Sequence, residues 1–367
     1  MTNTPYKKRN LGLDIVRSIA ILLVLIEHSH LYFIFGNQPG IWGVEIFFVL
    51  SGYLIGQIIL RSFSDGVTFG KIKEFWIRRW FRTVPMYFLV LIFLDLFLDP
   101  EGGLHWKYYL FLQNLTDHFI FFPVSWSLTI EEWFYLLLPL LFLGISGTKK
   151  LQKRATGIML TGVVLAILLI RIIYVIEFDP VFDLGIRKFP PLRLDALMIG
   201  VLLAYVKLHY KHIFQKMASL SVFLFSLVGM VAIALFFYKN SGPGNLLNSS
   251  FFARAFIFTC MSLSFALALP WVEQQPFLSK AGNRHPFRFL VTNLSLMTYT
   301  VYLVHYDIFS RIVVAPPYSL AWLGQVGLSL LLTFVLSTVL YRFFEKPMTD
   351  LRDRFGKRAK KRKMDAS

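Results

Sequence analysis

Long apolar runs recur along this chain and constrain its fold more than any other feature. They are separated by charged or Pro/Gly-rich breaks and fall at residues 11–35, 41–60, 84–98, 124–146, 156–177, 191–208, 217–238, 251–272, 290–314 and 320–344. Such runs are typical of helices that cross a lipid bilayer. With 56% hydrophobic and only 16% charged residues in 367, the composition excludes a soluble domain. We predict an all-α polytopic membrane protein, a bundle of about ten transmembrane helices.

The distribution of basic residues predicts the orientation of this bundle. An even number of spans puts both termini on one side, and both ends of the chain are basic, with Lys7, Lys8 and Arg9 at one and RDRFGKRAKKRK at the other. Basic residues favour the cytoplasmic side, so we expect cytoplasmic N- and C-termini. The formal charge of +17 then results from basic residues that set the topology or contact anionic lipid, and we expect no nucleic-acid partner. We predict one transmembrane domain at 1–350 and a basic cytoplasmic tail at 351–367.

The first span carries ionisable residues deep inside an apolar helix. Arg17 and His28 lie eleven positions apart, which corresponds to about 16 Å along a helix axis. Such groups are costly in a bilayer and usually face protein or a water-filled cavity. A cation toward one membrane face and a histidine toward the other indicate a site that is reached from both sides.

Topology places further ionisable residues at the depth of His28. They come from five predicted spans, in the outer half of the membrane: His28, Glu45, Glu131, Glu132, Arg193, Asp195 and His305. Three arginines lie at the opposite mouth, in a segment before residue 84 that we predict to be an amphipathic helix at the inner interface: Arg78, Arg79 and Arg82. The convergence of these groups from separate helices favours a catalytic or transport site.

Structural explanations compete with each of these assignments. His28 can be a satisfied histidine at a helix interface, and Glu45 can pair with Arg193 only to hold helices together. Glu131 and Glu132 are consecutive, so they point about 100° apart and at most one is expected to face the cavity of His28. Arg79 and Arg82 can bind the phosphates of membrane lipids instead of a ligand. Ser51-Gly52 can be a point of close helix packing.

Taken together and in chain order, these residues resemble the acyltransferase 3 family of bacterial integral membrane acyltransferases. The resemblance extends from Leu11 to Pro347. It is carried by Arg17-x10-His28, GVEIFFVLSGYLIG (43–56, with Glu45 where the family usually has Asp), Arg79-x-x-Arg82, SWSLTIEEWFYLLLPLL (125–141), RLDALMIGVLLA (193–204), MTYTVYLVH (297–305) and YRFFEKP (341–347).

The resemblance implies a donor and an acceptor. The donor is an acyl-CoA, most simply acetyl-CoA, and the acceptor is a hydroxyl of a cell-surface or lipid-linked carbohydrate. It also implies roles for Arg17, His28, Arg79 and Arg82, and a multi-pass location in the bacterial inner membrane. We expect no metal.

The chemistry of acyl transfer suggests how these residues act. A base must take the hydroxyl proton, and positive groups must stabilise the oxyanion. We expect His28 to be the base or a transient acyl carrier, oriented by Glu45, Glu131 or Glu132. Arg17 is expected to hold the pantetheine or thioester end of the donor, and Arg79 and Arg82 its phosphates. Acceptor binding is assigned to the remaining ionisable residues: Glu131, Arg193, Asp195 and His305.

A secondary transporter or exporter of a glycan or lipid is the alternative. Ionisable residues in the middle of a bundle are typical of such proteins too. However, the sequence shows no paired halves with matching Gly/Pro-interrupted spans. We therefore favour the enzyme.

Overall fold

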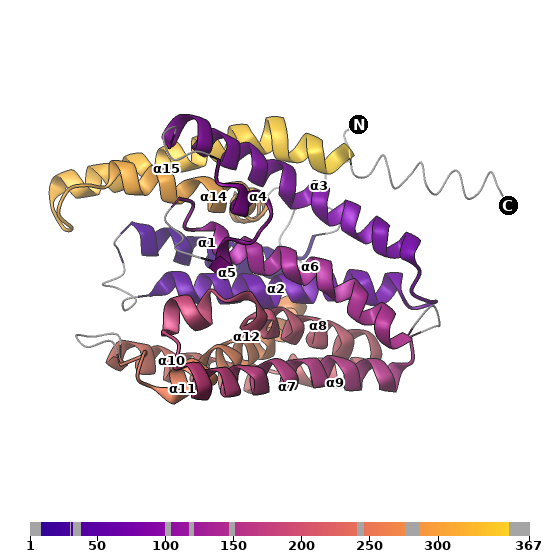
Figure 1. The fold of residues 1–367 in the computed structure, drawn as a ribbon. Helices are drawn as coiled ribbons and strands as arrows, with labels where there is room; N and C mark the ends of the chain where they lie inside the picture. The colour runs from indigo at the N-terminus through magenta and orange to yellow at the C-terminus, as the bar shows by residue number, and fades with distance from the viewer. Residues whose placement is uncertain are drawn as a thin grey trace. The chain divides into compact units, whose positions relative to one another are not determined.

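A computed structural model describes residues 9–29, 31, 38–99, 104–116, 121–146, 151–240, 246–275 and 286–351. Within these ranges the protein is entirely helical, and no strand occurs (Figure 1). The elements longer than fifteen residues are α1 (Leu11–His28), α2 (Pro39–Ser62), α3 (Phe69–Phe93), α6 (Ser125–Ser146), α7 (Lys153–Phe178), α8 (Leu194–His209), α10 (Leu220–Asn240), α12 (Ile257–Gln274), α14 (Pro286–Ile312) and α15 (Leu320–Leu340). The shorter ones are η3 (Leu94–Leu98), α4 (Trp106–Tyr109), α5 (Gln113–Thr116), η4 (Phe182–Arg187), η5 (Pro190–Leu192), α9 (Lys211–Met217), α11 (Phe251–Ala255) and η6 (Tyr341–Glu345).

These helices confirm an all-helical membrane protein and a large part of the expected span pattern. In the described part of the chain, eight helices are long and apolar enough to cross a membrane. Helices α1 and α8 occupy the two other expected spans. The first carries three charged residues in its 18, and the second has only 16 residues. The tail from 352 to 367 lies outside the described residues.

The third span differs from the prediction. The sequence predicts an interfacial helix that ends before a separate span at residue 84, whereas α3 runs without a break from Phe69 and continues through η3 to Leu98. Pro85 lies inside this helix. Proline is tolerated in membrane helices because neighbouring groups satisfy the freed backbone carbonyl. The arginines at 78, 79 and 82 therefore lie on the same continuous helix as the apolar segment that follows them.

The chain forms two compact units, each built from two stretches of sequence. The first unit contains residues 1–61 and 152–298, and the second contains residues 62–151 and 299–367. Helix α14 contributes its residues up to Thr298 to the first unit and the rest to the second.

The first unit is organised around α2, of which 72% of the apolar window is buried. Glycines allow α8 to approach it closely. A Cβ on Gly52 would collide with the carbonyl oxygen of Leu197, and a Cβ on Gly200 would lie 2.6 Å from the backbone nitrogen of Tyr53. The interpretation of Ser51-Gly52 as a close-packing point is thereby confirmed.

The second unit joins α3 to α6 through side chains that donate to backbone carbonyls. The indole of Trp76 donates to the carbonyl of Tyr135 at 3.1 Å. The phenol of Tyr87, buried on α3, donates to the carbonyl of Tyr108 at 3.1 Å and so attaches α4. These bonds fix the face of α3 that carries its polar residues.

The close approach of α2 and α8 predicts an unusual response to alanine. Alanine at a helical glycine normally favours the helix by about 0.5–1 kcal/mol. Gly52→Ala should instead destabilise the protein by about 1–3 kcal/mol, because backbone atoms occupy the space of the new methyl group. Denaturant unfolding in detergent micelles measures this change.

Gly162→Ala on α7 is the matched control, since a Cβ there meets no atom within 4 Å. An equal stability for the two variants would contradict the close packing of α2 and α8.

Candidate functional site

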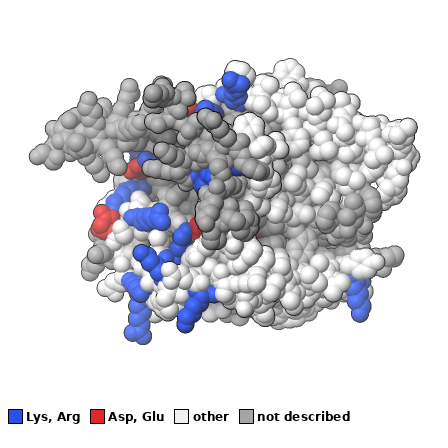
Figure 2. Space-filling view, turned by 180° about the vertical axis from the view of Figure 1, so that it is seen from behind, with Lys and Arg blue, Asp and Glu red and all other residues white. Residues whose placement is uncertain are grey.

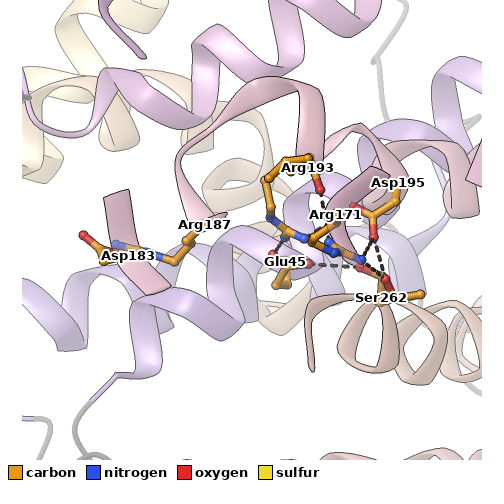
Figure 3. Close-up of polar contacts among 9 residues, drawn as sticks. Glu45, Arg171, Asp183, Arg187, Arg193, Asp195 and Ser262 are labelled. Atoms are coloured by element: carbon orange, nitrogen blue, oxygen red, sulfur yellow. Dashed lines mark hydrogen bonds and ion pairs between the residues drawn. The ribbon is translucent and has the colours of Figure 1, made fainter. Parts of the chain in front are cut away.

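A buried ionic network in the first unit connects three of the predicted site residues (Figure 3). Arg193, the N-cap of α8, donates to Glu45 of α2, and its other terminal nitrogen lies 3.4 Å from Asp195. Ser262 of α12 donates to the second Glu45 oxygen at 3.0 Å. All three charged side chains are at most 2% exposed. Both carboxylate oxygens of Glu45 therefore accept hydrogen bonds, one from Arg193 and the other from Ser262.

Arg171 on α7 completes this network, although its role was not predicted from the sequence. Its guanidinium is fully buried and donates to Asp195 at 2.9 Å, to the carbonyls of Leu192 and Ala255 at 3.0 and 2.9 Å, and to Thr259. It therefore ties α7 to η5, α8, α11 and α12 at once. The available signal was an arginine in the middle of an otherwise apolar span.

The network contains two acids and two arginines, so its formal charges cancel. Phe258 covers Arg193, with the guanidinium carbon 4.0 Å from the ring centroid. A second ion pair, between Asp183 and Arg187 of η4, lies apart from this network in the same view (Figure 3). Arg193 and Asp195 are thus fully buried and bonded to other protein groups, and the Nε of Arg193 has no hydrogen-bond partner among the described residues.

Arg17 belongs to a different polar cluster of the first unit. Its guanidinium donates to Ser295 of α14 at 3.4 Å. Ser295 in turn donates to Asp14 at 2.7 Å, and Asp14 is also paired with Arg9. Asp14 is only 4% exposed. Asp14 precedes Arg17 by three residues and shares its helix face, a spacing from which Asp14 could have been predicted as part of this cluster.

His28 is the last residue of α1, and its ring is bonded to the helix backbone. Nδ1 lies 2.9 Å from the carbonyl oxygen of Val24. Because a carbonyl oxygen only accepts, Nδ1 carries the hydrogen, and the neutral ring keeps its lone pair on Nε2. The half-buried imidazole therefore has the tautomer in which Nε2 can take a proton.

The second unit contains the arginine pair and the consecutive glutamates. Thr83 of α3 donates to Glu132 of α6 at 2.6 Å, and its backbone carbonyl accepts from Tyr299 of α14 at 2.7 Å. The guanidinium of Arg79 lies 5.9 Å from the ring of Tyr135. Thr83, one turn beyond Arg79, therefore connects the helix of the arginines to a predicted catalytic carboxylate.

Arg82 and Glu131 each have a partner in this unit. Arg82 lies 3.5 Å from Glu345 of η6, which is 1% exposed and also accepts from Thr300. The phenol of Tyr135 donates to Glu131 at 3.1 Å. Arg82 is 30% exposed, so its buried acid holds one side of the guanidinium while part of it stays accessible.

His305 is fully buried on α14. Its Nδ1 lies 2.8 Å from the carbonyl of Tyr302, and the phenol of Tyr302 is bonded to Ser127 of α6 at 2.6 Å. As in His28, the backbone carbonyl fixes the hydrogen on Nδ1 and leaves the lone pair on Nε2.

The predicted site residues are thus divided between the two units. The first contains Arg17, His28, Glu45, Arg193 and Asp195, and the second contains Arg79, Arg82, Glu131, Glu132 and His305. The structure brings Glu45, Arg193 and Asp195 together, and it brings Glu132 beside the helix of Arg79 and Arg82.

The apolar helices and the polar residues buried among them define a multi-pass membrane protein. The family model for the acyltransferase domain of the acyltransferase 3 family matches residues 10–342. The chain therefore belongs to the acyltransferase 3 family, which the sequence resemblance predicted.

Similar proteins occur in Staphylococcus aureus. A protein of strain COL that is provisionally named an O-acetyltransferase is 28% identical over 94% of this chain and 58% of its own length. The O-acetyltransferase OatA of strain NCTC 8325 is 27% identical over 92% of this chain and 57% of its own length. The chain thus spans less than three fifths of the length of these relatives. No solved structure matches it.

The ionic network predicts a large effect of removing Arg171. Arg171→Met removes one charged donor from the Asp195 carboxylate and the side-chain donor of two carbonyls, and it should destabilise the protein by about 3–5 kcal/mol in denaturant titrations. Arg154 is exposed on the same helix, and Arg154→Met should change the free energy of unfolding by no more than about 0.5 kcal/mol. Similar losses for both variants would show that the buried pairing does not stabilise this unit.

Proposed function

We propose that this chain is a membrane O-acyltransferase that moves an acyl group, most simply acetyl, from acyl-CoA to a hydroxyl of a cell-surface or lipid-linked carbohydrate. Membership of the acyltransferase 3 family and the names of its relatives support the reaction class. The observation that carries the choice of base is the bond from His28 Nδ1 to the Val24 carbonyl.

In this reaction the thioester C–S bond breaks and an ester C–O bond forms. Nε2 of His28 accepts the hydroxyl proton as the oxygen attacks the thioester carbon, and the thiolate of CoA leaves. The imidazolium then returns its proton to the thiolate, so that CoA departs as the thiol. Histidine suits this exchange because its ordinary pKa lies near the working pH.

The contacts of His28 suggest an orienting group other than Glu45, Glu131 or Glu132. A backbone carbonyl in the same helix fixes the ring tautomer, and both oxygens of Glu45 already accept hydrogen bonds from Arg193 and Ser262. We assign Glu45 a positioning role through the ionic network. Glu132, held by Thr83, is assigned as a second acid–base group.

The arginines are assigned to the donor. Arg17 stabilises the thioester end, and Ser295, which itself donates to Asp14, positions the guanidinium. Arg79 and Arg82 pair with the phosphates of CoA, for which guanidinium groups are well suited. The Glu345 carboxylate keeps Arg82 in place when no phosphate is bound.

The remaining residues are assigned to the acceptor or to its surroundings. Glu131 contributes hydrogen bonds toward the acceptor, and the fully buried His305 is assigned to the acceptor side as a positioning residue. Arg193 and Asp195 act from inside the network, since their complete burial favours a positioning role over direct contact with a sugar.

We also propose that the chain crosses the bacterial inner membrane ten times, with both termini in the cytoplasm. Helices α1 and α8 supply the two crossings beyond the eight that length and composition support. The charged residues of α1 are those expected to face protein or water.

The role of His28 predicts a specific loss of turnover. With purified protein, labelled acetyl-CoA and extracted envelope glycan, His28→Ala should lower kcat by about 100-fold or more, which is the usual contribution of a positioned base. Imidazole in the buffer should restore part of the rate. His212→Ala, which removes an exposed histidine of α9, should leave the rate unchanged.

Wild-type turnover by His28→Ala would refute His28 as the base. Glycan-dependent release of CoA by the unchanged protein distinguishes the enzyme from the transporter, because a transporter releases no CoA.

The role of Arg79 and Arg82 predicts a loss of donor affinity. Arg79→Ala with Arg82→Ala should raise KM for acetyl-CoA at least tenfold at low salt, and the difference should shrink at high salt because salt screens the phosphate contacts. Arg78→Ala, which removes an exposed arginine of the same helix paired with Glu74, serves as the control. An unchanged KM in the double variant would argue against the phosphate role.

A further inference from the structure

One end of the first unit combines lipid-facing helices with exposed basic residues. Only 33% of the apolar window of α7 and 17% of that of α10 are buried, so most of both surfaces faces lipid. The short helix α9 leads into α10, and the phenol of Tyr205 near the end of α8 donates to the carbonyl of Lys153 at the start of α7. Lipid headgroups must therefore lie beside this end of the unit.

Four basic side chains are exposed at this end and have no acidic partner among the residues that the structure describes. They are Lys153 and Arg154 in the first turn of α7, and Lys211 and Lys216 of α9. We call them the α7–α9 basic cluster. Figure 2 shows Lys and Arg side chains gathered over part of one face, while much of that face is white.

Aromatic residues fix Lys153 of this cluster and anchor α9. The Lys153 ammonium lies 3.9 Å from the ring centroid of Tyr210, close enough for a cation–π interaction that fixes its position. Phe214 anchors α9 with only 3% of its surface exposed, while the neighbouring Ile213 is 40% exposed. A basic helix with one buried and one exposed apolar side is typical of a helix in the headgroup layer.

Several other basic residues of this unit are paired with acids, unlike the cluster. At the same end, Lys207 is paired with Glu273 at 2.6 Å. Toward the opposite end, Arg187 and Lys188 share Asp183, and Arg254 is paired with Asp179. Unpaired positive charge therefore accumulates where α7, α8 and α9 meet the headgroup layer.

We propose that the α7–α9 basic cluster is a binding site for the phosphate headgroups of anionic membrane lipids. Lys153 and Arg154 face the phosphates from α7, and Lys211 and Lys216 from α9. Ile213 extends into the acyl region beside them. This site is independent of the acyl transfer reaction and of the arginine pair on α3.

The full chain, purified in a neutral detergent, can be titrated with phosphatidylglycerol or phosphatidylcholine and followed by native mass spectrometry. The unchanged protein should bind phosphatidylglycerol with clear preference. Each charge removed should lower that affinity about fivefold. A variant with Gln at all four positions should therefore lose the preference altogether.

Two controls separate the cluster from general charge and from misfolding. Lys239→Gln removes an exposed lysine at the far end of α10 and should leave phosphatidylglycerol binding unchanged. A variant with Lys153→Arg, Lys211→Arg and Lys216→Arg keeps the charges and should retain the preference.

Three results would overturn the proposal. The first is wild-type phosphatidylglycerol binding by the four-fold Gln variant when its thermal unfolding matches that of the unchanged protein. The second is equal binding of the two lipids by the unchanged protein. The third is full displacement of phosphatidylglycerol by free CoA, which would assign the cluster to a soluble nucleotide phosphate.

Discussion

Charge neutrality inside the first unit is the constraint on which the rest of its structure depends. Glu45, Arg171, Arg193 and Asp195 lie in one fully buried network contributed by α2, α7 and α8, and hydroxyl groups of α12 complete it. A charge left without its partner in such a place is strongly destabilising. The network therefore fixes how four helices meet, and the glycines of α2 and α8 supply the close approach that lets the charges reach one another.

The helical class, the approximate position of each apolar helix and the family were readable from the sequence. Hydropathy, which is a local property of the chain, determines the helical class and the helix positions, and the short motifs in chain order carry the family resemblance. The pairing of Glu45 with Arg193 was also anticipated, as the structural alternative to a catalytic Glu45. Its burial and its second partner, Ser262, favour that alternative.

Long-range partners were not readable in the same way. Arg171 meets Asp195 across 24 residues and Thr259 across 88, and no periodicity encodes such distances. The orienting group of His28 was sought among distant carboxylates, whereas the structure bonds its ring to the carbonyl four residues earlier. The continuous α3 was missed because its basic first half looks like an interfacial segment when it is considered alone.

The pairing of Glu45 with Arg193 also has a consequence for biosynthesis. Their positions differ by 148 residues, so at 5–20 residues per second the ribosome needs on the order of ten seconds or more to make the partner after the acid has emerged. During that interval the nascent segment around Glu45 has to enter the translocon with its acid neutralised by a proton or kept in contact with water. This segment therefore reaches its final position in the bilayer only after Arg193 has been synthesised and inserted.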